Sequence, residues 1–132
     1  MGRVLGVDVG TRRTGLAVSD VLGITCRPLA VVKAADTEEV VRHIAAAALE
    51  HEVEAVVVGI PRSLRGDRNA QLAHTESVVE SLRETVPMPV RTWDERYTTK
   101  MARRLVRPGE ELDAVAAAFM LQNYLDAQEK QS

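Results

Sequence analysis

The first patterned stretch of the chain alternates apolar and other positions. Leu5, Val7 and Val9 are separated by Gly6 and by an acid, Asp8. This period of two predicts a β-strand whose successive side chains point to opposite faces. A carboxylate beside strand backbone is costly to bury unless something pairs with it. Asp8 therefore either faces a cleft and binds a cation, or accepts a hydrogen bond from the following turn, and this stretch leaves both readings open.

Two further strands follow at short spacing, over residues 14–19 and 24–32. Pro28 favours an edge strand or a bulge, because proline cannot donate to the ladder of hydrogen bonds. Parallel neighbours need a long crossover connection, so these three closely linked strands are expected to be antiparallel.

The pattern then changes to alternating helices and strands. Asp36 or Thr37 is a suitable N-cap for a helix that ends near His51. Further elements are expected at 54–60 (strand), about 70–85 (helix), 90–93 (strand), from Thr98 or Thr99 to Leu105 (short helix), and from Asp113 onward (buried helix). The polar tail from Ala127 is expected to fray. This order of elements predicts an α/β fold. The crossover connections between its parallel strands are expected to be right-handed. Its mixed five-stranded sheet has three antiparallel and then two parallel strands, with helices on both faces, in a single domain over residues 1–132.

Composition narrows the class of protein. The 132 residues are 45% hydrophobic and 27% charged, as in a soluble globular domain, and the net charge of −2 gives no overall attraction to nucleic acid. Cys26 is the single cysteine, which excludes an internal disulfide and a cysteine-based zinc site and fits a reducing cytoplasm. The chain shows no leader and no apolar run near the roughly 20 residues that cross a bilayer, so no membrane association is expected.

Three acids fall at the ends of predicted elements: Asp8, Glu95 and Asp113. In open α/β sheets, ligands bind beyond the carboxyl ends of parallel strands. Clustered carboxylates repel one another unless a cation lies between them, and an all-oxygen set suits Mg²⁺ or Mn²⁺. Two such ions about 4 Å apart can activate a water and stabilise the leaving oxygen of a phosphodiester.

Each acid also has a structural alternative. Asp113 precedes an alanine-rich helix and could be its N-cap. Glu95 could form a surface ion pair with Arg96. Asp94 competes with Glu95, because alternation lets only one of them face the cleft; we favour Glu95. Asp20 and Asp67 are interpreted as turn residues.

Arginines cluster near the same ends of the predicted strands. Phosphate contacts from such loops would position a nucleic-acid backbone without reading its sequence, although solvated loop arginines are the alternative. The candidate nucleic-acid-binding residues are Arg12, Arg13, Arg62, Arg65, Arg68 and Arg96. Ordinary surface residues are expected at His43, His51 and His74, and core packing at Cys26 and Trp93.

With these residues assembled, the chain resembles the YqgF (RuvX-like) family of RNase H-like proteins, described as Holliday-junction resolvases and pre-16S rRNA processing nucleases. Five segments carry the resemblance: Leu5-Gly6-Val7-Asp8-Val9-Gly10-Thr11, Gly15-Leu16-Ala17-Val18-Ser19-Asp20, Val57-Val58-Gly59-Ile60-Pro61, Trp93-Asp94-Glu95-Arg96-Tyr97-Thr98-Thr99, and Asp113-Ala114-Val115-Ala116-Ala117-Ala118 with Leu121-Gln122-Asn123-Tyr124-Leu125. The resemblance implies that Asp8, Glu95 and Asp113 are metal-binding catalytic acids. It also implies a cytoplasmic, divalent-metal phosphodiesterase acting on rRNA precursor or on branched DNA, with a homodimer expected for junction resolution.

One segment departs from the family pattern. Relatives often carry a longer, lysine-rich stretch before the last helix, whereas residues 103–111 here are short and end in Glu110 and Glu111. A segment with fewer basic residues would neutralise fewer phosphates, so the affinity for nucleic acid would be lower. The three candidate acids would be unaffected. Two other classes of protein are considered. Sugar kinases and actin-like ATPases share the first motif but need a second lobe. A non-catalytic nucleic-acid-binding module would share the fold.

Overall fold

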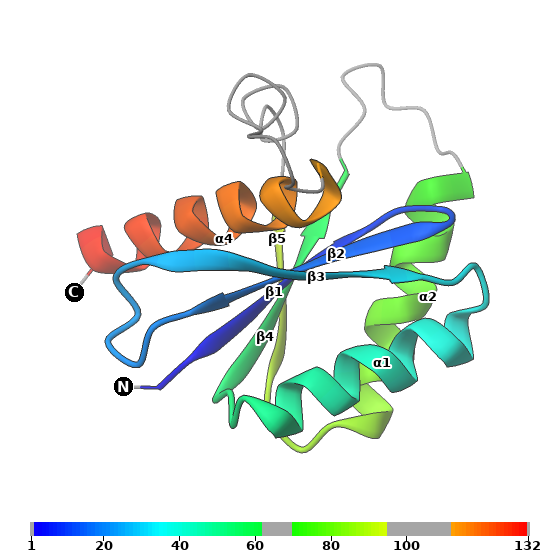
Figure 1. The fold of residues 1–132 in the computed structure, drawn as a ribbon, viewed down its shortest axis with the longest axis horizontal. Coiled ribbons are helices and arrows are strands. Elements are labelled where there is room, and N and C mark those ends of the chain that lie inside the picture. The colour runs from blue at the N-terminus through cyan, green and yellow to red at the C-terminus, as the bar shows by residue number, and fades with distance from the viewer. Residues whose placement is uncertain (1, 62–69, 95–111, 132) are drawn as a thin grey trace.

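A central β-sheet with helices on both of its faces makes up the protein (Figure 1). The computed structural model describes residues 2–61, 70–94 and 112–131. The elements are β1 (Val4–Val9), β2 (Arg13–Ser19), β3 (Cys26–Lys33), α1 (Thr37–Glu50), β4 (Ala55–Ile60), α2 (Ala70–Thr85), β5 (Val90–Asp94) and α4 (Leu112–Gln131).

The sheet has five strands in the order β3-β2-β1-β4-β5, so β1 lies at its centre. β1 and β2 are antiparallel, as are β2 and β3, whereas β4 runs parallel to β1 and β5 runs parallel to β4. The predicted mixed topology is therefore confirmed. β3 is an edge strand with a register shift beside Pro28, which agrees with both features that the proline favours.

Alternation in β1 supplies both layers of the core. Leu5, Val7 and Val9 are buried against α1 and α2, on what we call the helix-pair face. Val4 packs on the opposite face with Leu121 and Met120 of α4, which we call the α4 face (Figure 1). Asp8 has the parity of Val4 and Gly6, so its side chain belongs to the α4 face.

Local signals explain where α1 begins. Asp36 is its N-cap, and the Asp36 carboxylate accepts a hydrogen bond from the backbone N–H of Glu39 at 3.2 Å. The predicted choice between Asp36 and Thr37 is thus resolved in favour of Asp36.

Two predicted boundaries were wrong. β3 begins at Cys26 rather than at residue 24, because the Asp20 carboxylate accepts from the backbone N–H groups of Ile24 and Thr25 and keeps them in a turn. α4 continues to Gln131 rather than fraying at Ala127, since alanine, glutamine, glutamate and lysine are good helix formers. The short helix predicted from Thr98 or Thr99 lies outside the described residues. Among the described residues, none of the helices has both the length and the apolar character to cross a membrane.

Candidate functional site

Asp8 lies near the carboxyl end of the central strand, half-buried on the α4 face. Its neighbours across the sheet are both glycines: Gly15 of β2 is its partner on one side and Gly59 of β4 on the other. Cross-strand partners share a face of the sheet, so neither neighbour places a side chain beside the Asp8 carboxylate. On the Gly15 side, the missing side chain makes room for the backbone of α4.

The first turn of α4 lies directly against this position. A Cβ atom added at Gly15 would be 1.9 Å from the backbone carbonyl oxygen of Asp113 and 2.9 Å from the nitrogen of Ala114. The Cα atoms of an antiparallel pair such as Asp8 and Gly15 are roughly 4.5–5.5 Å apart. Residues 8 and 113, far apart in sequence, are therefore brought together at the backbone level.

Asp113 lies in the first turn of α4 and is half-buried. The helix begins at Leu112, one residue earlier, so the N-cap interpretation of Asp113 is wrong. An acid in the first turn is still favoured by the partial positive charge of the helix N-terminus. That favourable location is compatible with a second role at the cleft.

Glu95, the third predicted acid, lies outside the described residues, but the strand before it is described. Gly59 pairs with both Asp8 and Trp93, so Trp93 lies level with Asp8, and Trp93 packs on the α4 face. Asp94 pairs with Ile60, which packs against the helix-pair core. Register therefore directs Asp94 to the face opposite Asp8, which favours Glu95 in the choice between the two acids.

Two of the six candidate arginines are described. Arg12 lies in the turn from β1 to β2 and Arg13 is the first residue of β2; both are exposed near the carboxyl end of β1. The backbone N–H of Gly10 donates to the carbonyl of Arg13 at 2.9 Å, which closes this turn tightly. Arg62, Arg65, Arg68 and Arg96 lie outside the described residues, as does Asp67.

Gln71 is a residue that the sequence pattern did not identify. Its side-chain Nε2 donates to the backbone carbonyl of Val9 at 3.2 Å. This bond ties the first turn of α2 to the end of β1, one residue from Asp8. A glutamine at the start of a helix looks like any solvated polar residue in sequence, so only the three-dimensional contact reveals it.

The remaining candidates are structural. Asp20 is confirmed as a turn residue. The Cys26 thiol donates to the carbonyl of Ala118 at 3.1 Å, and burial raises the pKa of this thiol to about 11. Trp93 packs against Tyr124, in agreement with a core role.

His43 is exposed and His51 lies 3.6 Å from Glu50, whereas His74 is not a simple surface residue. Its Nε2 atom is buried and has no hydrogen-bond partner among the described residues. Within residues 2–61, 70–94 and 112–131, no three His, Cys, Asp or Glu side chains form a group that could hold a metal ion. The predicted set includes Glu95, which lies outside those ranges, so its metal-binding role stays a prediction.

Comparison with known proteins agrees with this geometry. Residues 2–127 match the RuvX family, described as Holliday junction resolvase. A relative from Halalkalibacterium halodurans is named as a candidate pre-16S rRNA nuclease. It is 37% identical over an alignment of 137 positions, which covers 96% of this chain and 98% of the relative.

Solved structures show the same fold. The T. thermophilus RuvC structure in complex with Holliday junction substrate is similar with a TM-score of 0.68 and 20% identity, over 100% of this chain and 98% of that one. A ROK hexokinase from Thermus thermophilus is similar with a TM-score of 0.51 and 23% identity, over 77% of this chain but only 38% of the kinase. The kinase chain is thus much longer than the part that matches this fold. The family match over residues 2–127, together with the relative that is 37% identical over nearly all of both chains, places this chain in the RuvX family of nucleases.

Proposed function

We propose that this nuclease hydrolyses phosphodiester bonds in structured nucleic acid with Mg²⁺ or Mn²⁺ held by Asp8, Glu95 and Asp113. The observation that carries the proposal is the contact of the first turn of α4 with Gly15, the cross-strand partner of Asp8. It brings two of the three acids to one end of the sheet. The register of β5 supports the third, because Trp93 is level with Asp8 and Glu95 follows it by two residues on the same face if the strand continues.

The donor set fits a hard divalent cation. All three side chains offer carboxylate oxygens, and the cross-strand neighbours of Asp8, Gly15 and Gly59, place no side chain beside it. When bound, a pair of such ions supplies an activated water and stabilises the leaving oxygen. The three carboxylates would hold such ions, and no nucleophilic side chain is required.

Arg12 and Arg13 extend from the turn next to the same end of β1. Their proposed role is to contact backbone phosphates on either side of the bond that is cut, which positions the strand without reading bases. Arg62, Arg65, Arg68 and Arg96 are proposed to serve in the same way. The Gln71 bond to the Val9 carbonyl would hold the first turn of α2 close to Asp8.

Two substrates are consistent with the relatives. The curated relative carries a name that refers to pre-16S rRNA, and the family description and the similar RuvC complex refer to a Holliday junction. An rRNA precursor requires one active site for each cut. A junction resolvase is expected to act as a homodimer, because two sites must be presented to two strands.

One experiment tests the function and separates the substrates. Purified protein is incubated with a labelled pre-16S rRNA fragment and with a labelled four-way DNA junction, with Mg²⁺, with Mn²⁺ and with EDTA. We expect metal-dependent cleavage of one substrate, abolished in Asp8→Asn and retained in Glu84→Gln, an exposed acid on α2 that controls for loss of charge. A non-catalytic binding module would bind without cutting, and Asp8→Asn would then bind and behave like the wild type.

A further inference from the structure

The last residue of β1 has a backbone carbonyl that its own sheet does not satisfy. Val9 is 1% exposed, so this carbonyl is shielded from water and needs a partner inside the protein. The N–H of Gly10, the next residue, donates to the carbonyl of Arg13 in β2 at 2.9 Å. The N–H of Val4, which has the same parity as Gly10, donates to the Ser19 hydroxyl of β2. Because the polar groups of successive strand residues alternate in direction, those of Val9 point toward β4.

A proline occupies the position that would complete the ladder between β1 and β4. The parallel register pairs Asp8 with Gly59. Val9 is therefore level with Ile60, and a ladder continued by one step would have its carbonyl accept from the residue that follows Ile60. That residue is Pro61, which has no backbone N–H, so β4 offers no donor to the Val9 carbonyl.

The side chain of Gln71 supplies the missing donor. Its Nε2 atom reaches from the first turn of α2 and donates to the Val9 carbonyl at 3.2 Å (Figure 1). A buried carbonyl without a partner would be costly, and this bond removes that cost. The peptide group between Val9 and Gly10 is thereby held at both ends, by Gln71 at its carbonyl and by Arg13 at its N–H. This is the first peptide group after Val9, the residue that follows Asp8.

We propose that Gln71 is a positioning residue for Asp8, and that it acts by replacing the N–H that Pro61 lacks. The inference rests on the proposed function, in which Asp8 binds a divalent cation. Metal binding requires a carboxylate held in one place, and groups that support a ligand from behind typically change metal affinity or activity by about 10–100-fold. A fixed peptide at the end of β1 restrains the part of the strand that carries the Asp8 carboxylate.

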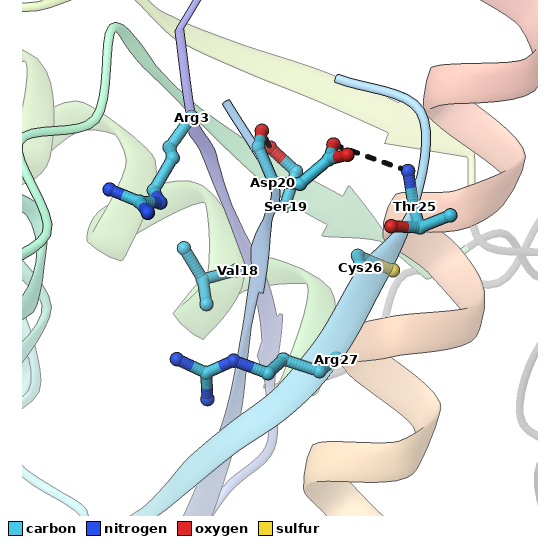
Figure 2. A pocket seen from close by; sticks show the side chains of 7 residues that line it. All are labelled: Arg3, Val18, Ser19, Asp20, Thr25, Cys26 and Arg27. Atoms are coloured by element: carbon cyan, nitrogen blue, oxygen red, sulfur yellow. Dashed lines mark hydrogen bonds between the residues drawn. The ribbon is translucent and has the colours of Figure 1, made fainter. Parts of the chain in front are cut away.

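Gln122 provides a matched control for a purely structural role. Its Nε2 atom donates to the carbonyl of Ile24 at 2.8 Å, so it also joins a helix to a backbone carbonyl. Ile24 lies in the turn after β2, where the Asp20 carboxylate accepts from the N–H of Thr25 (Figure 2). Because β2 ends beside the start of β1, this turn is at the opposite end of the sheet from Asp8.

The test uses the full chain and the variants Gln71→Met, Pro61→Ala, their combination, and Gln122→Met. Gln71→Met keeps an unbranched side chain with a similar preference for helix and removes the amide. Pro61→Ala provides a backbone N–H at the position where the ladder lacks its donor. The double variant therefore shows whether a backbone donor can take over from the side chain of Gln71.

Three quantities are measured at a temperature far below unfolding, so that all variants are folded. Hydrogen exchange of the Gly10 amide is followed by nuclear magnetic resonance without metal. Mn²⁺ affinity is measured by electron paramagnetic resonance in the presence of cleaved product strands. Single-turnover cleavage is measured against substrate concentration, which separates the maximal rate from the affinity for substrate.

We expect Gln71→Met to speed exchange of the Gly10 amide about fivefold, the factor that corresponds to one typical hydrogen bond. Its Mn²⁺ affinity is expected to be about tenfold weaker, and its maximal cleavage rate lower with an unchanged affinity for substrate. Adding Pro61→Ala to this variant should restore all three quantities, and Pro61→Ala alone should behave like the wild type. Gln122→Met should leave the three quantities unchanged even where it lowers the free energy of unfolding.

The proposal is overturned by wild-type values in Gln71→Met, by a lack of recovery in the double variant, or by the same losses in Gln122→Met. If the wild type itself neither binds Mn²⁺ nor cleaves, it is the nuclease proposal that fails. Exchange of the Gly10 amide, which needs no metal, then still decides whether Gln71 replaces the N–H that Pro61 lacks.

Discussion

The indole ring of Trp93 meets the ring of Tyr124 edge-on, with ring centroids 5.4 Å apart and planes at 87°. The Tyr124 hydroxyl also accepts a hydrogen bond from Nη1 of Arg91 at 2.6 Å. These contacts join the edge strand β5 to α4. Trp93 precedes Glu95 by two residues in the sequence and Tyr124 shares a helix with Asp113, so this contact joins the strand before one candidate acid to the helix that carries another.

Substitutions at Tyr124 separate the ring contact from the hydrogen bond. We expect Tyr124→Phe to keep the ring and lower the free energy of unfolding by about 1 kcal/mol. Tyr124→Ala removes both and leaves a cavity, so about 3–5 kcal/mol is expected, with loss of cleavage. Urea unfolding measures both values, and an equal loss in the two variants would show that the ring contact has no separate contribution.

Gly15→Ala tests the contact that brings Asp113 to Asp8. The added methyl group would overlap the Asp113 carbonyl at 1.9 Å, so the first turn of α4 must move. We expect a loss of about 1–3 kcal/mol, as for other overpacked sites, and a larger relative loss of cleavage.

Gly2→Ala is the matched control for this substitution, because its Cβ would meet only the exposed side chain of Glu54, at 3.1 Å. Thermal unfolding and cleavage rates are compared for both variants. Wild-type cleavage in Gly15→Ala would show that the approach of α4 to β2 does not matter for activity.

Neighbouring acids at the end of β5 are expected to differ. Asp94 pairs with Ile60, which packs toward the helix-pair core, so Asp94→Asn is predicted to cleave like the wild type. Glu95→Gln is predicted to lose cleavage because it removes a metal-binding carboxylate. The reverse result, measured under single-turnover conditions, would assign the metal-binding role to Asp94.

The Cys26 thiol is expected to be unreactive in the folded protein. Burial, the largest cause, raises its pKa from 9.0 to about 11. Roughly one thiol in a thousand is then ionised at pH 8, and alkylation by iodoacetamide should be slow until the protein unfolds. Fast alkylation of native protein at pH 8 would contradict this environment.

The same shift predicts how stability depends on pH. Because the folded-state pKa is raised, the neutral thiol stabilises the fold below about pH 9, and this contribution is lost as the pH rises toward 11. Cys26→Ala should remove that part of the pH dependence. An identical decline in wild type and Cys26→Ala between pH 9 and 11 would assign it to other groups.

Local pattern was sufficient for most of the fold. Alternation predicted β1, helical spacing predicted α1 and α2, and Pro28 indicated an irregular edge strand. These signals act within a few residues, so a single sequence contains them. The start of β3 was missed because the Asp20 carboxylate, four residues away, determines where the turn ends.

The candidate site depends more on contacts between distant segments. Asp8 stood out because it is an acid in an apolar strand. Gly15 did not, because a glycine in a strand suggests only a weak or irregular position, while its close contact is with Asp113. The choice between Asp94 and Glu95 required the β4–β5 register, which short-range pattern does not contain.

Binding of Mn²⁺ tests most directly whether the three acids act together. Electron paramagnetic resonance titrations are made in the presence of cleaved product strands, which cannot react further. Wild type and Glu84→Gln are predicted to bind Mn²⁺ saturably, and Asp8→Asn, Glu95→Gln and Asp113→Asn each to bind fewer ions or bind them more weakly. A wild-type binding curve in any of those three variants would contradict a shared metal site.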